Sequence, residues 1–573
     1  MSELVWHPSL ALLVGAALLA VSRGRVRAWV AVTAPAVALG LVQWVPDGPL
    51  WTVSFLDDVL TPFAGDALGR LFATVFAIAA LAGGVFALGA QAGQQAKQSL
   101  ELPAAYVYAA SAIGVAFAAD LFTVFIFWEL MAIGSTLVLW SAATPASYRA
   151  SMRYAMVHLL GGVLLLAGIA GHLTQTGDLS FTAMQADSVA HWLILLGFLI
   201  NAGAPPFSAW VSDAYPEASV SGMVFLSAFT TKTAVLVLWR GFPGTELLIG
   251  VGLFMVLYGI VYALLENDMR RVFAYSIVNQ VGFMVVGIGV GTEMALNGAA
   301  AHAFAHIIYK ALLLMSAGSV LLMTGRRSYA QLGGLYRTMP LTSACAAVGA
   351  LAISAFPLTS GFISKSMVTQ SAIDEHLLWV WLLLTAASAG TFFYAGVRFF
   401  WFVFLGKDSG LRPKDPPRLM QVAMLFMALL CVAPGLWPQW LYARLPFAVD
   451  YVPYTSAHVL TQLQLLLFAA LAFFLMLPLL KRTLTITLDT DWLYRRALSR
   501  WVMGAQQIVG RLRLRAEQAW CAGSAWVLTI TERYHGVDGR LSLTWPIRSM
   551  ALWVLVLLFT YLALYFLRRA GYV

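Results

Sequence analysis

Ala300-Ala-His302-Ala-Phe-Ala-His306-Ile-Ile-Tyr-Lys310-Ala-Leu-Leu-Leu-Met315 is the stretch that decides how the rest of the chain is interpreted. It is apolar enough to lie in a bilayer, yet it carries two histidines and a lysine spaced four residues apart. In a helix each four-residue step turns a side chain by only about 40°, so all three project from one face. A charge or an imidazole in hydrocarbon costs about 2.5–3.5 kcal/mol on insertion scales. The stripe therefore predicts a wet or protein-lined interior path, and we interpret the helix as part of a proton or ion relay.

The composition of the whole chain indicates a polytopic membrane protein. Charged residues make up 11% and hydrophobic residues 61% of its 573 positions, whereas soluble proteins carry about 25% charged residues. Apolar runs of about 20 residues, long enough to cross the hydrocarbon core, recur from end to end. The composition excludes a soluble enzyme with a single anchor. Three scattered cysteines indicate neither a disulfide framework nor a thiolate metal site.

The apolar runs predict about 16 transmembrane helices. The expected spans lie near residues 7–22, 28–46, 69–90, 103–119, 121–142, 153–173, 189–203, 218–240, 248–265, 272–290, 296–322, 343–370, 379–405, 420–438, 459–480 and 548–567. The first run lacks a basic start and a cleavage site, so we expect it to be retained as a span.

The net charge of +9 comes from basic residues in the loops. It need not indicate nucleic-acid binding, because membrane proteins carry excess Lys and Arg on cytoplasmic loops. With the N-terminus outside, the expected cytoplasmic loops hold Arg23, Arg25, Arg27, Lys97, Arg149, Arg153, Arg270, Arg271, Arg326, Arg327, Arg337, Lys407, Arg412, Lys414, Arg418, Lys481 and Arg482. The outside loops hold mainly Arg70, Arg240 and Arg444 together with Asp57, Asp58, Asp178, Asp187, Asp374 and Glu375. This asymmetry sets the predicted orientation.

Two spans are predicted to be broken, at Leu199-Ile-Asn201-Ala-Gly-Ala-Pro205-Pro206-Phe and at Phe356-Pro-Leu-Thr-Ser-Gly361-Phe-Ile-Ser-Lys365. Pro and Gly free backbone groups there, which only a partner or a cavity can satisfy. The breaks fall in two parts of similar helix number. Paired interrupted helices are typical of repeated, in some cases inverted, halves with the transport path between them.

The pattern changes after Arg482, where Leu488-Asp489-Thr-Asp491-Trp492 opens an amphipathic segment that ends near Arg540. Basic and apolar residues alternate along it. Basic amphipathic helices lie on membrane surfaces, so we expect a surface helix before the last span. A strap that contacts a partner subunit is the alternative.

Glu129 and Lys232 are the isolated charges of the first half. Glu129 stands among aromatic residues in Phe125-Ile-Phe-Trp-Glu129, and a lone intramembrane carboxylate must be paired or protonated. Lys232 lies some eight residues, about 12 Å, from the end of its span, which is a long reach for a snorkelling side chain. Both are candidate proton carriers because intramembrane ionisable groups are functional by default. The alternatives are a helix-packing hydrogen bond for Glu129 and carbonyls at a helix break for Lys232.

The second half adds His302, His306, Lys310 and Lys365. The four-residue histidine spacing also suits zinc, but no third ligand accompanies the pair, so we favour titrating or water-holding roles. Lys365 follows the break at Gly361, where freed carbonyls could hold it; solvation near the outer face is the alternative. We expect Arg398 to be structural. No cofactor motif, phosphate-binding loop or nucleophile elbow is found, so we expect no cofactor and no catalytic redox or hydrolytic chemistry in this chain.

Several motifs together resemble one family. They are Phe127-Trp128-Glu129-Leu130, Ala204-Pro-Pro206-Phe-Ser-Ala-Trp210-Val-Ser-Asp213-Ala-Tyr-Pro216, Asn267-Asp-Met-Arg-Arg271-Val-Phe-Ala-Tyr-Ser276, His302 through Lys310-Ala-Leu-Leu, and Gly361-Phe-Ile-Ser-Lys365. Over roughly residues 70–440 the chain resembles the proton-translocating, antiporter-like membrane subunits. These include the D subunit of Mrp-type multisubunit Na⁺/H⁺ antiporters and the antiporter-like subunits of respiratory complex I. Lys232 and the Leu-Asp-Thr-Asp-Trp tail are most similar to the D-type subunits.

The resemblance implies two inverted five-helix repeats, each with a broken helix, and a polar axis along the membrane midplane. The expected divisions are N-terminal helices (1–102), the repeats (103–240 and 248–405), C-terminal helices (420–480), the amphipathic helix (488–540) and the last span (548–567). By position, the proton relay implied by the resemblance consists of Glu129, Lys232, His302, His306, Lys310 and Lys365. It further implies a multi-pass protein of the bacterial plasma membrane, with other antiporter subunits, protons and Na⁺ as partners.

One position departs from the family pattern. The family pairs its acid with a lysine nine residues before the tryptophan that is Trp210 here, and this chain has Asn201. Asparagine can hold a water molecule but cannot change charge between pH 5 and 9. Either Lys232 takes over as the partner of Glu129, which we favour, or the first half does not pump as its relatives do.

Three functions are open at this point. The first is the proton-conducting subunit of a cation/proton antiporter. The second is a pump module driven by electron transfer in partner chains, as in complex I or a membrane hydrogenase. The third is a scaffold with a vestigial relay, for which Asn201 is the best support.

Overall fold

The computed structural model describes residues 5–55, 58–91, 100–480, 489–542 and 546–570. Asp57, Lys97, Lys481, Arg482 and Leu488, which entered the topology and tail predictions, lie outside the described residues. The chain divides into two compact units, Met1–Asp491 and Trp492–Val573. Each unit is described by itself.

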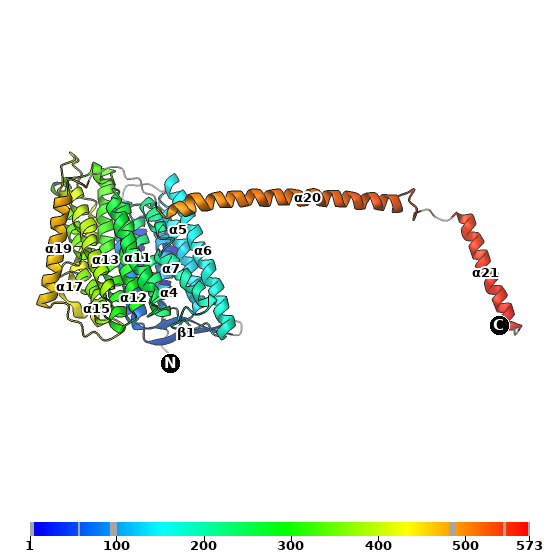
Figure 1. The fold of residues 1–573 in the computed structure, drawn as a ribbon, viewed down its shortest axis with the longest axis horizontal. Coiled ribbons are helices and arrows are strands. Elements are labelled where there is room, and N and C mark those ends of the chain that lie inside the picture. Colours follow the sequence, from blue (N-terminus) through cyan, green and yellow to red (C-terminus); the bar gives the residue numbers. More distant parts are fainter. Residues whose placement is uncertain (1–4, 56–57, 92–99, 481–488, 543–545, 571–573) are drawn as a thin grey trace. The chain divides into compact units, whose positions relative to one another are not determined.

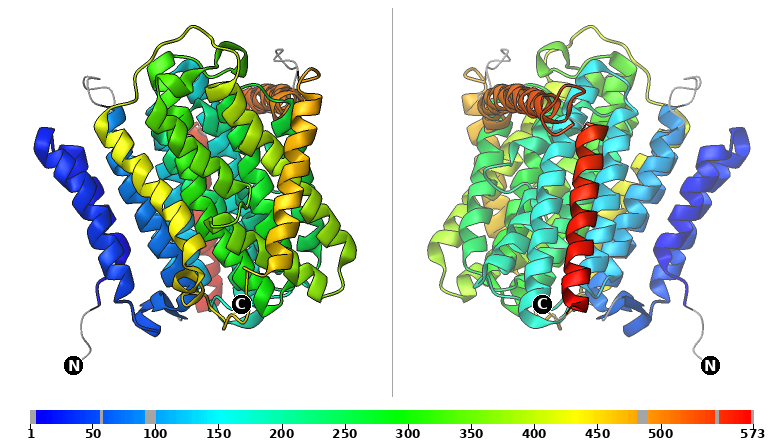
Figure 2. Two further views of the ribbon diagram at one scale, coloured as in Figure 1. Left: turned by 90° about the vertical axis from the view of Figure 1, so that its left-hand side faces the viewer. Right: turned by 90° about the vertical axis from the view of Figure 1, so that its right-hand side faces the viewer.

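The first unit is a bundle of helices packed side by side (Figures 1 and 2). The described residues contain twelve helices long and apolar enough to cross a membrane and four shorter apolar helices. The all-α, polytopic fold class is therefore confirmed. The helices of this unit are α1 (Pro8–Val21), α2 (Gly24–Gln43), α3 (Ala67–Ala90), α4 (Glu101–Phe117), α5 (Leu121–Trp140), α6 (Pro145–Thr176), α7 (Val189–Ala202), α8 (Ala209–Ala214), α9 (Gly222–Ala228), α10 (Thr230–Gly241), α11 (Leu247–Leu265), α12 (Met269–Val290), α13 (Glu293–Thr324), α14 (Pro340–Ile353), α15 (Ser360–Asp374), α16 (Leu378–Thr391, continued by wider π-helical turns to Leu405), α17 (Arg418–Leu436), α18 (Pro438–Tyr442) and α19 (Ser456–Met476).

A β-hairpin that the sequence analysis missed lies at the lower edge of the bundle in Figure 1. Strands β1 (Gly48–Phe55) and β2 (Asp58–Gly65) pair antiparallel. The Phe63 side chain is buried, and the Thr61 amide donates to Asp120 Oδ2 at 2.9 Å. The hairpin is thereby attached to the start of α5. A β-rich run around two adjacent aspartates was the available signal.

The two halves of the bundle repeat one plan. Helices α6 and α13 each contain 32 residues and begin at residues 145 and 293, which is 148 positions apart. The same offset relates α5 to α12, which begin at residues 121 and 269. It also relates two isolated bridges, Asp120–Ser180 and Asp268–Ser328. Four spans, an even number, lie between α5 and α12, so the counterparts run in opposite directions through the bundle.

Both predicted helix breaks are present. Helix α7 ends at Ala202 and α8 begins at Ala209, while α14 ends at Ile353 and α15 begins at Ser360. In the first break the Trp210 indole N–H donates to the freed Ile200 carbonyl at 2.8 Å. In the second, the Leu358 amide donates to the Tyr454 hydroxyl at 3.2 Å. The backbone groups freed by the breaks thus find partners inside the protein, as a bilayer requires.

The second unit contains α20 (Ser499–His535) and α21 (Ile547–Arg569). A helix is therefore present where the amphipathic segment was predicted. Its apolar residues include Trp501, Ile508 and Leu512. Arg513 donates to Glu517 one turn away at 2.8 Å. Attachment of α20 to a membrane surface stays a prediction.

Candidate proton-relay site

The polar face of α13 lies in the interior of the bundle. His302, His306 and Lys310 are each fully buried, with exposed fractions of 0%. The neighbouring α12 is buried over the whole of its apolar window. The three side chains therefore face protein and not lipid, as the stripe predicted.

Lys310 begins a row of polar contacts. Its Nζ donates to Ser276 Oγ at 2.6 Å and lies 5.3 Å from the centre of the Phe273 ring. The Tyr394 hydroxyl is 3.0 Å from Ser276 Oγ and 3.2 Å from Asn279 Oδ1. The lysine is thus joined to two neutral polar residues on α12 and one tyrosine on the π-helical segment after α16.

The row continues to the second helix break. Gln280 Nε2 donates to Asn279 Oδ1, and Gln280 Oε1 lies 3.2 Å from His302 Nε2. His302 Nδ1 lies 3.2 Å from Ser364 Oγ, and Lys365 is the next residue in the chain. We call this set the relay row, and its members are Lys310, Ser276, Tyr394, Asn279, Gln280, His302, Ser364 and Lys365.

Lys365 occupies the position predicted from its break. Its Nζ is 3.4 Å from the carbonyl oxygen of Ile353, the last residue of α14. The ammonium also lies 4.7 Å from the centre of the Phe283 ring, a distance at which a cation is attracted to the ring face. Only 2% of this lysine is exposed, so its side chain lies inside the protein.

His306 stands beside the row and is not a member of it. Its ring lies 6.4 Å from that of His302 and 5.3 Å from that of Tyr309. Neither ring nitrogen has a hydrogen-bond partner among the described residues. Buried polar groups of this kind are usually met by ordered water; a titrating or water-holding role for the histidine pair stays a prediction.

Lys232 lies at a third helix break, between α9 and α10. Its Nζ donates to the Ser227 carbonyl at 2.7 Å and to Thr231 Oγ1 at 3.0 Å. The ammonium is therefore held by a carbonyl and a hydroxyl at the break, which is the alternative that the sequence left open for this lysine.

Glu129 does not have the partner that we favoured. Among the described residues, the Lys232 ammonium contacts Ser227 and Thr231 and not Glu129, and Glu129 Oε1 has no hydrogen-bond partner. The carboxylate packs against Gly162 of α6, while Asn201 lies against the neighbouring Gly161. Both polar atoms of the Asn201 amide are buried without a partner. The predicted pair of Glu129 and Lys232 is absent because the break before α10 leaves the Ser227 carbonyl close to the Lys232 ammonium, which donates to it instead.

His158 is a site residue that the sequence analysis missed. It is 148 positions before His306, and is the counterpart of that histidine in the first half. Its ring stacks on Tyr154 at 3.9 Å and meets Trp210 edge-on at 4.7 Å. Tyr154 and Gly162 stand where the second half has His302 and Lys310. The internal repeat was the signal, and the first half carries one of the three groups.

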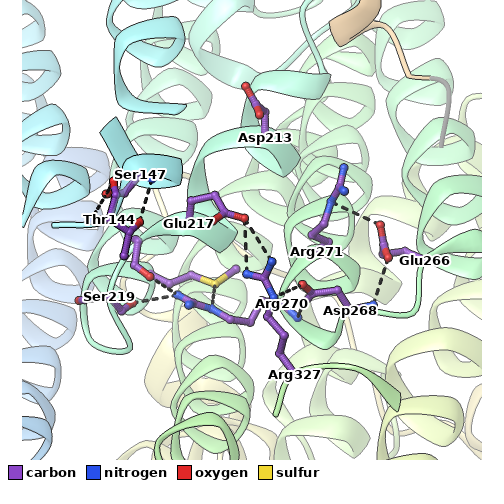
Figure 3. A network of polar contacts seen from close by, with 12 residues as sticks. Thr144, Ser147, Asp213, Glu217, Ser219, Glu266, Asp268, Arg270, Arg271 and Arg327 are labelled. Carbon is purple, nitrogen blue, oxygen red and sulfur yellow. Dashed lines mark hydrogen bonds and ion pairs between the residues drawn. The ribbon is translucent and has the colours of Figure 1, made fainter. Parts of the chain in front are cut away.

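A second polar network joins the two halves at their junction (Figure 3). Arg327 binds Asp268 at 2.7 Å and Glu217 at 3.4 Å. Arg270 donates to the carbonyls of Ala218 and Ser219 at 2.9 and 2.8 Å. These contacts hold the segment after α8 against the start of α12. They fix the geometry between the halves without entering the relay row.

Arg398 has a similar structural role. It donates to the Ala263 carbonyl and to Asn267 Oδ1, both at 3.0 Å. Its guanidinium also lies 5.3 Å from the centre of the Tyr329 ring. The structural interpretation given to this residue agrees with these contacts.

The middle of this chain is similar to the antiporter-like class of membrane subunits. Residues 118–391 match the family described as NADH:quinone oxidoreductase/Mrp antiporter, TM. The resemblance predicted from the motifs is therefore confirmed. The matched segment contains Glu129, Lys232, the α13 stripe and Lys365.

Among individual relatives, the D subunit of the Na⁺/H⁺ antiporter of Alkalihalophilus pseudofirmus is 28% identical over 354 residues, which cover 57% of this chain and 71% of that protein. Two solved structures share the fold at 22% identity. A chain of the Mrp complex of a Dietzia species matches with a TM-score of 0.67, over 80% of this chain and 99% of that one. A chain of the archaeal membrane-bound sulfane sulfur reductase, a respiratory complex, matches with a TM-score of 0.71, over 97% and 99%.

Proposed function

We propose that this chain is the proton-conducting subunit of a multisubunit Na⁺/H⁺ antiporter. The observation that carries the proposal is the relay row, which joins Lys310 to the residue beside Lys365 through groups at 2.6 to 3.2 Å. Such a row leads from one buried lysine toward the other without a lipid-exposed step. The similarity to the D subunit of an Na⁺/H⁺ antiporter supports the choice of cation.

The proposed relay uses Glu129, Lys232, His302, His306, Lys310 and Lys365. Lysines and histidine exchange protons along the row, and hydroxyl and amide groups orient the water between them. A unit charge about 6 Å away, at an effective dielectric constant of 20, changes the free energy of protonating a neighbour by roughly 3 kcal/mol. A charge that arrives within about this distance of Lys310 would therefore favour release of its proton.

The proposed setting is the bacterial plasma membrane, with further membrane subunits bound around this chain. The length and apolar composition of α21, which are sufficient to cross a membrane, support such a setting. A helix of this kind needs lipid or another protein around it.

The test is transport in inverted membrane vesicles that contain the whole complex. Lys232→Ala and Glu129→Gln are expected to abolish Na⁺-driven proton movement while the amount of protein in the membrane is unchanged. Lys414→Ala changes an exposed loop lysine and is the matched control, expected to transport as the wild type does. Retained transport in both relay variants would refute the proposal.

A redox-driven proton pump is the second candidate. The fold match to a chain of a respiratory complex over 97% of this chain favours it. Gentle purification of the tagged protein from native membranes separates the two. Small hydrophobic subunits alone support the antiporter, whereas flavin or iron–sulfur proteins in the same peak would assign the driving force to electron transfer.

A further inference from the structure

A cavity of about 550 Å³ opens where α13 begins, α15 ends and α19 begins. Its lining includes three exposed carboxylates, Glu293, Asp374 and Asp450. No lysine or arginine is among the described residues that line it. We call this cavity the acidic vestibule. By the asymmetry of the loop charges it belongs to the outer face.

A second, smaller cavity of about 40 Å³ lies beside Lys365. Its lining is mainly polar and includes Ser366, Thr369, Ser388 and Gln462. A space of this size holds roughly three water molecules. We call it the lysine chamber. Among the described residues, the Lys365 ammonium has one hydrogen-bond acceptor, the Ile353 carbonyl at 3.4 Å. The lysine chamber provides a polar route from this ammonium out of the relay row.

His458 is a lining residue of both cavities. It stands in the first turn of α19, where its amide donates to Thr455 Oγ1 at 3.2 Å. Its ring stacks on Phe362 at 4.6 Å with an interplanar angle of 17°. The imidazole therefore has a fixed orientation between the acidic vestibule and the lysine chamber.

The tautomer of His458 follows from its partner. Nδ1 lies 2.7 Å from the Pro453 carbonyl oxygen, and a carbonyl can only accept. Nδ1 therefore carries the proton of the neutral ring, and Nε2 keeps a lone pair. Nε2 can therefore take up a proton and release it again without a rotation of the imidazole ring.

Solvent exposure decreases from the acidic vestibule, past His458, to Lys365. The vestibule carboxylates are exposed, His458 is half-buried, and Lys365 is 2% exposed. Tyr451 lines the vestibule and its hydroxyl interacts with Ser366 of the chamber. The titratable and charged groups around the imidazole are Lys365, Glu293, Asp374, Asp450, Tyr451 and Tyr454. The three carboxylates concentrate cations, hydronium included, at the mouth.

We propose that His458 passes protons between Lys365 and the acidic vestibule, which makes the vestibule the outer port of the second half; this rests on the proposed proton transport. In one direction, an N–H bond of the Lys365 ammonium breaks and chamber water carries the proton to His458 Nε2, leaving a neutral lysine and an imidazolium. The Nε2–H bond then breaks toward vestibule water, and the neutral imidazole is restored. The reverse sequence loads the lysine.

The first experiment is His458→Gln in the complete complex in vesicles. Glutamine can hold water but cannot carry the proton, so Na⁺-driven proton movement is expected to fall by at least about tenfold. Added imidazole, small enough for the vestibule, is expected to restore most of the rate. Lys365→Ala is expected to be equally slow and not restored, because the donor is missing. His376→Asn changes an exposed histidine outside both cavities and is expected to transport normally.

The second experiment does not depend on how well a variant folds. Gln370 lines the vestibule, so Gln370→Cys in a Cys521→Ser background places one reactive thiol there; the other cysteines are buried. Proton movement is measured before and after labelling with a bulky thiol reagent. A loss of at least about fivefold on labelling is expected, and no change in the Cys521→Ser background alone.

The outcomes separate the two proposals. If wild-type vesicles show no Na⁺-driven proton movement, the proposed function fails before any variant is compared. If the wild type transports, then normal rates in His458→Gln and in the labelled Gln370→Cys protein overturn the vestibule alone. A slow His458→Gln that imidazole does not restore, with unchanged transport after labelling, also overturns it, because the histidine would then be structural.

Discussion

The substitution Gly162→Ala tests whether transport depends on the position of the Glu129 carboxylate. A Cβ built on Gly162 would lie 1.9 Å from Glu129 Oε1. Since real Cβ contacts are essentially never shorter than 3.0 Å, the carboxylate must retreat by about 1 Å. It can do so by rotating its own flexible side chain, so the backbone of α6 is left in place.

The neighbouring glycine provides a matched control. A Cβ at Gly161 would find its nearest atoms at 3.4 Å, an ordinary van der Waals distance. Both substitutions replace glycine by alanine in the same turn of the same helix, and each favours the helix by about 1 kcal/mol. The two variants therefore differ mainly in what their methyl group does to Glu129.

A displacement of about 1 Å in a positioned reacting group costs on the order of 100-fold in rate, which is roughly 2.7 kcal/mol of barrier. We therefore expect Gly162→Ala to lose about 10- to 100-fold of Na⁺-driven proton movement in vesicles, with Gly161→Ala close to the wild type. The amount of assembled complex, measured by a tag on a partner chain, should be equal in both. If Gly162→Ala transports as Gly161→Ala does, the position of the carboxylate is irrelevant and Glu129 should be removed from the relay.

The other predictions concern stability. Asp489→Ala removes the acceptor of the buried Tyr258 and Tyr275 hydroxyls, at 2.7 and 2.5 Å. Each unsatisfied group costs about 1–3 kcal/mol, so the free energy of unfolding in a denaturant titration should fall by about 2–6 kcal/mol. Asp538→Ala, at an exposed site, should leave it unchanged. Arg270→Ala removes two charge-assisted hydrogen bonds to carbonyls at the junction of the halves, each worth about 1.5–3 kcal/mol, so the purified protein should unfold several degrees lower; an unchanged melting temperature would show that the network contributes nothing. Gly361→Ala places a methyl group 1.8 Å from the Ala352 carbonyl oxygen, a backbone atom that cannot yield cheaply, so the protein should fail to accumulate in membranes, whereas Gly504→Ala, with open space around it, should accumulate normally.

The charged members of the site could be predicted from the sequence because a charge in an apolar run is conspicuous. Lys310 and Lys365 were identified in this way, and both are buried as expected. The neutral members could not be predicted. Ser276, Asn279 and Tyr394 are ordinary residues in apolar helices, and only the packing of α12 against α13 and the segment after α16 brings them together.

The sequence left two partners open for Lys232, Glu129 or carbonyls at a helix break, and the structure shows a carbonyl. The position of Lys232 gives its depth in a span but not the direction of its side chain. The break before α10, which no Pro or Gly marks, gives the ammonium a carbonyl partner at Ser227 and leaves Glu129 alone. The breaks marked by Pro205 and Gly361, in contrast, were predicted at the right places.

The length of the relay row, eight residues of α13, determines how strongly proton movement along it responds to the membrane potential. From Lys310 to His302 a proton advances at most about 12 Å along the helix axis, out of a hydrocarbon core about 30 Å thick. It therefore crosses at most about 40% of the electric field. One elementary charge crossing the whole field gains about 2.3 kcal/mol per 100 mV, so this step is worth at most about 0.9 kcal/mol, or roughly fivefold in an equilibrium. The remaining voltage drop must fall on the steps that lead into and out of the row, and it is there that transport should respond most steeply to an applied potential.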